Sequence, residues 1–331
     1  MKRKLMIILA SVMAFSIIAT GCSSNKTTDP AASKKDKSTK KTFVTIATGG
    51  SSGAYFALGG AISNLLNEKV VGVNASVQST GASAVNATLI GEGKVNIAFA
   101  MNDVVSYAYT GTEVFKEKGK VENLRGIASL YPNFVQVITL EGKGINEIED
   151  LKGKKVGVGA PGSGTEVNAR QILGASGITY DDIDEDFLSY AEAVEQMKNG
   201  AVDAVFLTSG LPNASIMDLA TTKDVKIVPI RKAIIEKLAK DFPFYSSAMI
   251  KGGTYDDKED VETAAVTTLL VTSAEMDEEL VYNITKTIFE NLKNLTDTHS
   301  SAKDISVDTV RRGMPIPLHP GAEKYFKELG K

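Results

Sequence analysis

Short apolar runs alternate with stretches of helical periodicity along most of this chain. Apolar residues spaced three or four positions apart across Tyr55–Leu66 predict an amphipathic helix. Further helices are expected over Ser83–Ile90 and Asp277–Leu295. Strand–helix alternation of this kind predicts an α/β fold with parallel sheets. The runs of strand length are Phe43–Ala47, Val73–Val77, Val95–Ala100, Phe134–Leu140, Lys155–Val158, Phe187–Tyr190 and Val202–Leu207.

Two glycine-rich turns stand at equivalent places in this pattern. Thr48–Tyr55 and Val156–Thr165 each follow a predicted strand and lead into a predicted helix. About 40 residues after each turn comes the pattern G-x-V-[ND]-x-x-F, at Gly93–Phe99 and at Gly200–Phe206. We therefore expect two similar α/β lobes, although βαβ units also resemble one another without being repeats.

The placement of these turns indicates a binding site for a small anion. Ligands of open α/β sheets bind beyond the carboxyl ends of the strands, where the free N–H groups of helix starts point. Two such turns facing each other across a cleft can hold a molecule with an anionic group at each end. Polar residues at the same edge are candidate ligand contacts or else caps and turns, and tyrosines are candidate pocket walls or else core. They are Thr80, Asn102, Ser163, Thr165, Thr208, Ser209 and Asn213, with Tyr55, Tyr131 and Tyr245.

The second turn also resembles a nucleotide-binding loop. Gly157, Gly159 and Gly162 form G-x-G-x-x-G, and Asp181 lies about 20 residues further on, where a ribose-binding acid is expected. Pro161 stiffens the turn, however, and no lysine follows as a phosphate loop requires. We therefore prefer a small anion to a dinucleotide. A capping box, Ser163-x-x-Glu166, is the simplest role for Glu166.

The first 41 residues predict export and anchoring. A basic start and the apolar run Leu5–Ala19 are typical of a signal peptide, which we place at residues 1–21. Small residues before Cys22 form a lipobox, so we expect lipidation of Cys22 and an anchor on the outer face of the bacterial cytoplasmic membrane. An ordinary signal peptide with an incidental cysteine is the alternative. Residues 22–42 contain no large apolar side chain and are expected to form a flexible tether.

Composition narrows the function further. From Thr42 onward, 28 basic and 38 acidic side chains leave a net charge of −10, which argues against nucleic-acid binding. Cys22 is the only cysteine, and neither His299 nor His319 stands in a metal-ligand spacing. The chain contains no G-x-S-x-G motif. We therefore expect no enzyme, no cofactor and no metal.

Four segments carry a family resemblance. They are TIATGGSSGAYFALGGAISNLL (Thr45–Leu66), LKGKKVGVGAPGSGTEVNAR (Leu151–Arg170), DAVFLTSGLPNASI (Asp203–Ile216) and LHPGAEKYF (Leu318–Phe326). The chain resembles the TAXI family, the solute-binding subunits of tripartite ATP-independent periplasmic (TRAP) transporters. The resemblance implies a type II periplasmic-binding-protein fold, in which two lobes enclose a hinged cleft. It also implies TRAP integral-membrane subunits as partners and a ligand such as glutamate, glutamine or 2-oxoglutarate.

The resemblance also implies which segments line the cleft. They are the first turn, the second turn from Pro161, and Thr208–Asn213. This adds Gly50, Ser51, Ser52, Gly53 and Gly164 to the candidate contacts. No arginine stands in either turn, so backbone N–H groups and hydroxyls are expected to recognise the ligand.

We expect a monomer in which the chain crosses between the lobes twice, near Tyr131–Pro132 and between Lys251 and Ser273. Lobe 1 then comprises residues 43–132 and about 265–331, and lobe 2 comprises about 133–264. Two alternatives remain open for the function. The protein could serve an ATP-driven importer, or it could be a lipoprotein that only senses or sequesters another small anion.

Overall fold

The computed structural model describes residues 41–255 and 259–331. The predicted signal peptide, Cys22 and nearly all of the predicted tether lie outside these residues. The described residues belong to one compact unit, Lys40–Lys331. Its first elements are β1 (Thr42–Ala47), α1 (Ala54–Lys69), β2 (Val73–Gln78), α2 (Ser83–Gly91), β3 (Ile97–Met101) and α3 (Asn102–Thr110).

Two long strands follow this first group and enclose a second one in the sequence. The long strands are β4 (Leu124–Leu140) and β10 (Val261–Ser273). The elements between them are β5 (Lys155–Gly157), α4 (Gly164–Ala175), β6 (Asp184–Asp186), α5 (Tyr190–Lys198), β7 (Ala204–Ser209), α6 (Ala214–Ala220), β8 (Val225–Val228), α7 (Lys232–Asp241) and β9 (Ser246–Ile250). The chain ends with α8 (Glu278–Phe289), α9 (Leu292–Thr298) and α10 (Pro320–Glu328).

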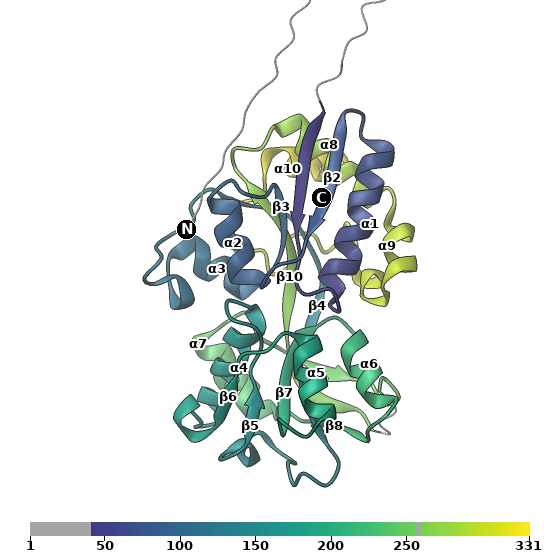
Figure 1. The fold of residues 1–331 in the computed structure, drawn as a ribbon. Coiled ribbons are helices and arrows are strands. Elements are labelled where there is room, and N and C mark those ends of the chain that lie inside the picture. The colour runs from purple at the N-terminus through teal and green to yellow at the C-terminus, as the bar shows by residue number, and fades with distance from the viewer. Residues whose placement is uncertain (1–40, 256–258) are drawn as a thin grey trace, which may run out of the picture. The chain divides into compact units, whose positions relative to one another are not determined.

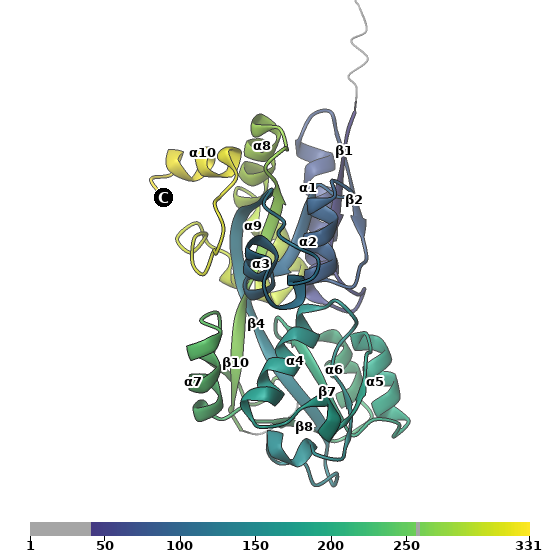
Figure 2. The same ribbon diagram turned by 90° about the vertical axis from the view of Figure 1, so that its left-hand side faces the viewer.

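The strands form one ten-stranded sheet that is shared by two lobes. Its main path is β2-β1-β3-β10-β4-β7-β5-β6, while β8 pairs with β4 and β9 with β10. Figures 1 and 2 show β4 and β10 running side by side from one lobe into the other. The first group and α8–α10 make up one lobe, and α4–α7 with β5–β8 make up the other. The predicted α/β fold with two lobes is therefore confirmed.

The internal repeat predicted from G-x-V-[ND]-x-x-F is visible in the topology. In each lobe the central strand comes first, and its two parallel neighbours follow after one helix each, as β2-β1-β3 and as β6-β5-β7. Gly93 and Gly200 both have positive φ, +66° and +74°, just after helices α2 and α5. Glycine adopts this conformation without the steric cost that other residues incur. The two copies of the motif thus end equivalent helices and begin equivalent strands.

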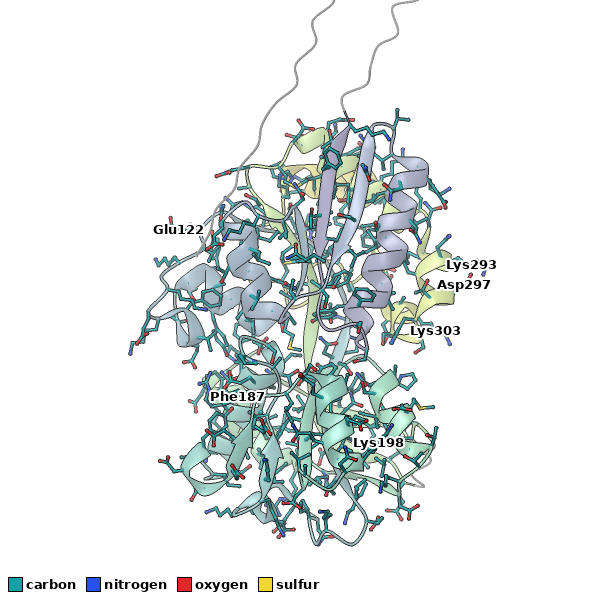
Figure 3. The ribbon with its side chains drawn as sticks, viewed as in Figure 1. Glu122, Phe187, Lys198, Lys293, Asp297 and Lys303 are labelled. Carbon is teal, nitrogen blue, oxygen red and sulfur yellow. The ribbon has the colours of Figure 1, made fainter. Side chains whose placement is uncertain are left out.

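One predicted strand is wrong. Phe187–Tyr190 was expected to be extended, but β6 ends at Asp186 and α5 begins at Tyr190. Ser189 and Glu192 form a reciprocal capping box that starts the helix there. Phe187 is 43% exposed and packs edge-on against Tyr180, on the surface where Figure 3 labels it.

One helix prediction also needs correction. The single helix expected over Asp277–Leu295 is divided into α8 and α9, because Asn291 leaves helical geometry and its Nδ2 donates to the Thr287 carbonyl at 2.7 Å. Asn213 is the N-cap of α6, with its Oδ1 accepting from the Ser215 and Ile216 N–H groups.

Apolar side chains from both faces of the sheet fill the cores. Leu58, Ile62, Phe99 and Phe326 are at most 1% exposed in the core of the first lobe. Charged side chains lie on the surface, such as the Lys293–Asp297 pair on α9 (Figure 3). Within the part of the chain that the structure describes, no helix combines the length and the apolar character needed to cross a membrane.

Candidate functional site

A cavity of about 80 Å³ lies between the two lobes, at the carboxyl ends of the parallel strands. This space exceeds several times what one water molecule needs, so it suits a small organic molecule rather than a dinucleotide. Among the described residues that line it, none carries a charged side chain. The lining residues are Gly49, Gly50, Gly53, Ala54, Tyr55, Thr80, Gly81, Ala82, Met101, Asn133, Ala160, Ser163, Gly164, Thr165, Ser189, Tyr190, Thr208 and Ser209.

Four helices begin at this cavity. The N-cap residues of α1, α2, α4 and α5 are Gly53, Ala82, Ser163 and Ser189, and all four line it. Each helix start carries a partial positive charge from the aligned peptide dipoles of its helix. The cavity is therefore electropositive without a cationic side chain, which favours an anionic ligand.

The structure brings most of the predicted site residues to this cavity. Both glycine-rich turns contribute, and so does the end of β7. The predicted residues that line the cavity are Gly50, Gly53, Tyr55, Thr80, Ser163, Gly164, Thr165, Thr208 and Ser209. Ser163 caps α4 through Glu166 N–H, whereas the Glu166 carboxylate turns to Arg170 and Tyr180, so only half of the expected capping box forms.

Six predicted contacts do not line the cavity. Ser51 is exposed and Ser52 is half-buried at the tip of the first turn. Asn102 instead joins two segments of its own lobe, because its Oδ1 accepts from Thr267 N–H at 3.0 Å and its Nδ2 donates to the Gly313 carbonyl at 3.2 Å. Asn213 caps α6 as described above.

The other two predicted contacts that do not line the cavity are tyrosines. Tyr131 is 1% exposed in the core of the first lobe, which is the alternative role considered for it. The Tyr245 hydroxyl is also buried, where it accepts from Asn168 Nδ2 at 2.8 Å and donates to Gln171 Oε1 at 2.7 Å. An aromatic residue near a strand end fits a core as well as a pocket, and the sequence alone does not separate the two.

The hydroxyl of Thr165 is occupied by the protein. Tyr190 O–H donates to the Thr208 carbonyl at 2.7 Å, since a carbonyl can only accept. In the 2.8 Å pair of Thr165 and Tyr190, Thr165 must therefore be the donor. Thr165 also accepts from Thr208 N–H at 3.3 Å. Its hydroxyl thus positions Tyr190 and β7 and has no proton left for a ligand, contrary to our expectation that it is a ligand donor.

Seven lining residues were missed by the sequence analysis. Asn133 is a polar residue inside a long apolar strand, and the capping box at Ser189 marks a helix start, so both left a signal that could have been used. The others are small or apolar and left none: Gly81, Ala82, Met101 and Ala160, together with Tyr190.

The lobes touch on both sides of the cavity. On one side, the Gly162 carbonyl accepts from Ala84 N–H at 3.1 Å and from Val85 N–H at 3.4 Å, so a turn of one lobe caps helix α2 of the other. On the other side, Ser300 Oγ donates to the Leu211 carbonyl at 2.7 Å. The structure therefore shows the lobes in contact around the cavity.

A buried polar network also connects the lobes behind the cavity. Asn168 Nδ2 on α4 donates to Asp103 Oδ2 on α3 at 2.7 Å. Gln171 Nε2 on α4 donates to the Tyr107 hydroxyl on α3 at 3.1 Å. Burial raises the pKa of the Asp103 carboxyl to about 6. One carboxyl thus titrates close to neutral pH at the contact between the lobes.

The two histidines have structural contacts. His319 is the N-cap of α10, where its Nδ1 accepts from Gly321 N–H, and its Nε2 lies 3.1 Å from the Met276 carbonyl. His299 Nδ1 accepts from Ser301 N–H. Within residues 41–255 and 259–331, no three His, Cys, Asp or Glu residues are placed to hold a metal ion.

This two-lobed α/β fold is also that of a solved arginine-binding protein. The model of the NMT1-like family matches residues 46–330, and the chain belongs to this family.

Three solved structures illustrate the similarity. A protein from Bordetella bronchiseptica RB50 is 18% identical, with a TM-score of 0.53 over 87% of this chain and 83% of that chain. An ancestral arginine-binding protein bound to arginine is 16% identical, with a TM-score of 0.50 over 80% of this chain and 99% of the other. The periplasmic aliphatic sulphonate binding protein SsuA from Escherichia coli is 15% identical, with a TM-score of 0.48 over 86% and 82%.

Proposed function

We propose that this protein captures a small organic anion in the cavity between its two glycine-rich turns and delivers it to the membrane subunits of a transporter. The observation that carries the proposal is the convergence of four helix starts on a cavity lined only by neutral side chains. Each charge–dipole interaction contributes about 0.3–2 kcal/mol. A micromolar ligand needs about 8 kcal/mol, so several helix starts and the hydroxyls must act together.

The membrane transporter is the second part of the proposal. The resemblance of the two turns to the TAXI family points to TRAP subunits, with glutamate, glutamine or 2-oxoglutarate as ligands. The alternative, a binding protein of an ATP-driven importer, fits the comparisons better, because similar solved proteins include ones named as components of ABC transporters for sulfonate and for L-cystine. We therefore favour the ATP-driven importer. A TRAP permease gene beside the gene of this protein would instead support the TRAP transporter.

The mode of attachment completes the proposal. Lipidation at Cys22 would hold the binding unit on the outer face of the cytoplasmic membrane, and residues 23–41 would link it flexibly to the anchor. Treating intact cells with radiolabelled palmitate should label the protein, and Cys22→Ser should remove the label.

We also propose that the lobes move about the two long strands. The hinge would lie near residues 131–133 of β4 and near residue 265 of β10, which are neighbours in the sheet. These positions divide the chain into residues 43–132 with about 265–331, and about 133–264. Opening would separate Gly162 from α2 and expose the cavity, and closing would restore the cap on that helix.

Calorimetric titration tests the binding function. The probe panel is glutamate, glutamine, 2-oxoglutarate, succinate, 2-hydroxyglutarate, an alkanesulfonate and NAD, added to residues 40–331 after unfolding and refolding to remove bound ligand. We expect one-to-one binding of at least one small acid and no heat from NAD, since the cavity is too small for a dinucleotide. Binding of NAD alone would contradict the proposal and restore the dinucleotide interpretation of Gly157–Gly162.

A further inference from the structure

The position of Asn133 suggests what kind of acid the cavity takes; this inference rests on the function proposed above. Asn133 lies on β4, where the chain passes from one lobe to the other, and is 0% exposed. Its Nδ2 donates to the Tyr55 hydroxyl at 2.8 Å. Its Oδ1 has no hydrogen-bond partner among the described residues, and the residue lines the cavity. A buried acceptor without a partner in the described chain therefore belongs to a residue of the cavity wall.

Two hydroxyls of the other lobe can act as hydrogen-bond donors. Thr208 Oγ1 is buried without a partner in the described part of the chain. Ser163 Oγ accepts from Glu166 N–H, and its own proton has no acceptor in the structure's described residues. Two further lining hydroxyls are already used, since Thr80 donates within the first lobe and Ser189 donates to Glu192. The cavity thus offers hydrogen-bond donors on the lobe 2 side and one acceptor on β4.

The acceptor has an energetic consequence. Leaving a buried polar atom without a hydrogen bond costs about 1–3 kcal/mol. A ligand that places a carbonyl or carboxylate oxygen against Asn133 Oδ1 leaves that cost in place and adds repulsion. A ligand that places an O–H or N–H there removes it. Sites built to bond a ligand hydroxyl discriminate strongly against the analogue that lacks it.

The donor on the ligand should be neutral. An ammonium group could also bond Asn133 Oδ1, but four helix starts make the cavity electropositive. None of the described lining residues is a carboxylate that could offset a cation. A hydroxyl or an amide N–H satisfies the acceptor without adding positive charge.

We propose that Asn133 determines specificity, and that the ligand is a small organic acid whose body carries a neutral donor, a hydroxyl or an amide N–H. The acid group faces the helix starts and the hydroxyls of Ser163 and Thr208. The neutral donor faces Asn133 Oδ1. A plain dicarboxylate and an oxo acid lack this donor, whereas the corresponding hydroxy acids have it.

Matched pairs of acids test this inference by calorimetry on the refolded binding unit. The pairs are lactate with pyruvate, malate with succinate, and 2-hydroxyglutarate with 2-oxoglutarate, using both enantiomers of each hydroxy acid. In the pair of the right chain length, we expect one hydroxy enantiomer to bind at least 10-fold more tightly than its partner. Asn133→Leu should reduce this ratio to about one, while Asn294→Leu, on the exposed face of α9, should leave it unchanged.

The outcomes separate the two proposals. If the oxo or unsubstituted acid binds as tightly as the hydroxy acid in the unaltered protein, the inference is overturned and the binding function stands. Binding of none of these acids, nor of any other small acid in the panel, would overturn both. Discrimination that persists in Asn133→Leu would remove the role of this residue. The comparison within the unaltered protein is decisive even if Asn133→Leu does not fold.

Discussion

Replacing Gly164 with valine should weaken binding of the tightest acid in the panel at least 100-fold, about 2.7 kcal/mol. Gly164 is the first residue of α4 on one side of the cavity. A Cβ atom there would lie 2.5 Å from Met101 Sδ and 3.0 Å from Ser83 Oγ, which both belong to the other lobe. The branched side chain therefore keeps the lobes apart around the ligand, since the three atoms nearest this Cβ all belong to the other lobe.

The free energy of unfolding without ligand should change little in Gly164→Val, because separated lobes accommodate the side chain. Gly174→Val is the matched control, since Gly174 lies in the same helix and a Cβ there meets nothing within 4 Å. Calorimetry and denaturant unfolding of both variants measure the two effects. Normal affinity in Gly164→Val would show that binding does not require the lobes to approach as they do here.

Asp103→Asn should stabilise the protein by about 3 kcal/mol above pH 7 and have no effect below pH 4. Burial raises the pKa of this carboxyl from 3.8 to about 6, and the difference corresponds to about 3 kcal/mol. Between pH 3.8 and about pH 6, the folded state binds more protons than the unfolded state, so the stability of the unaltered protein falls as the pH rises. Above about pH 6 the protein with Asp103 has lost all of this stability, whereas Asp103→Asn has no charge to bury and does not lose it.

Denaturant unfolding of both proteins between pH 4 and pH 8 measures this difference. Asparagine can still accept from Asn168 Nδ2, so the contact between the lobes is retained. Asp297→Asn is the control, since that carboxylate is 62% exposed beside Lys293. A stability difference that does not vary with pH would mean that Asp103 does not carry this titration.

Local sequence signals predicted the parts of the site that are built locally. A glycine-rich turn between a strand and a helix places backbone N–H groups at the sheet edge whatever the rest of the chain does, so Gly53 and Gly164 could be identified from the sequence. The strand–helix alternation and the repeated G-x-V-[ND]-x-x-F motif likewise predicted two equivalent halves. The wrong strand at Phe187–Tyr190 arose because an apolar run was given more weight than the capping box beside it.

Contacts between distant segments could not be predicted in this way. Asn133 reaches the cavity only because β4 continues from one lobe into the other, and the pairing of β4 with β10 and β7 depends on residues more than 60 positions away. Asn102 and Thr165 have side chains suited to ligand binding, yet their hydrogen-bonding capacity is used within the protein. Whether a polar side chain can still bond a ligand depends on which residues surround it in the folded protein.

Small-angle X-ray scattering with and without the tightest acid of the panel tests most directly whether both lobes hold one ligand. We predict a smaller radius of gyration with the acid, because the Gly162 carbonyl returns to α2 when the lobes meet around it. Gly164→Val should not show this decrease. Superimposable curves from the free and the saturated protein would contradict closure of the lobes around the ligand.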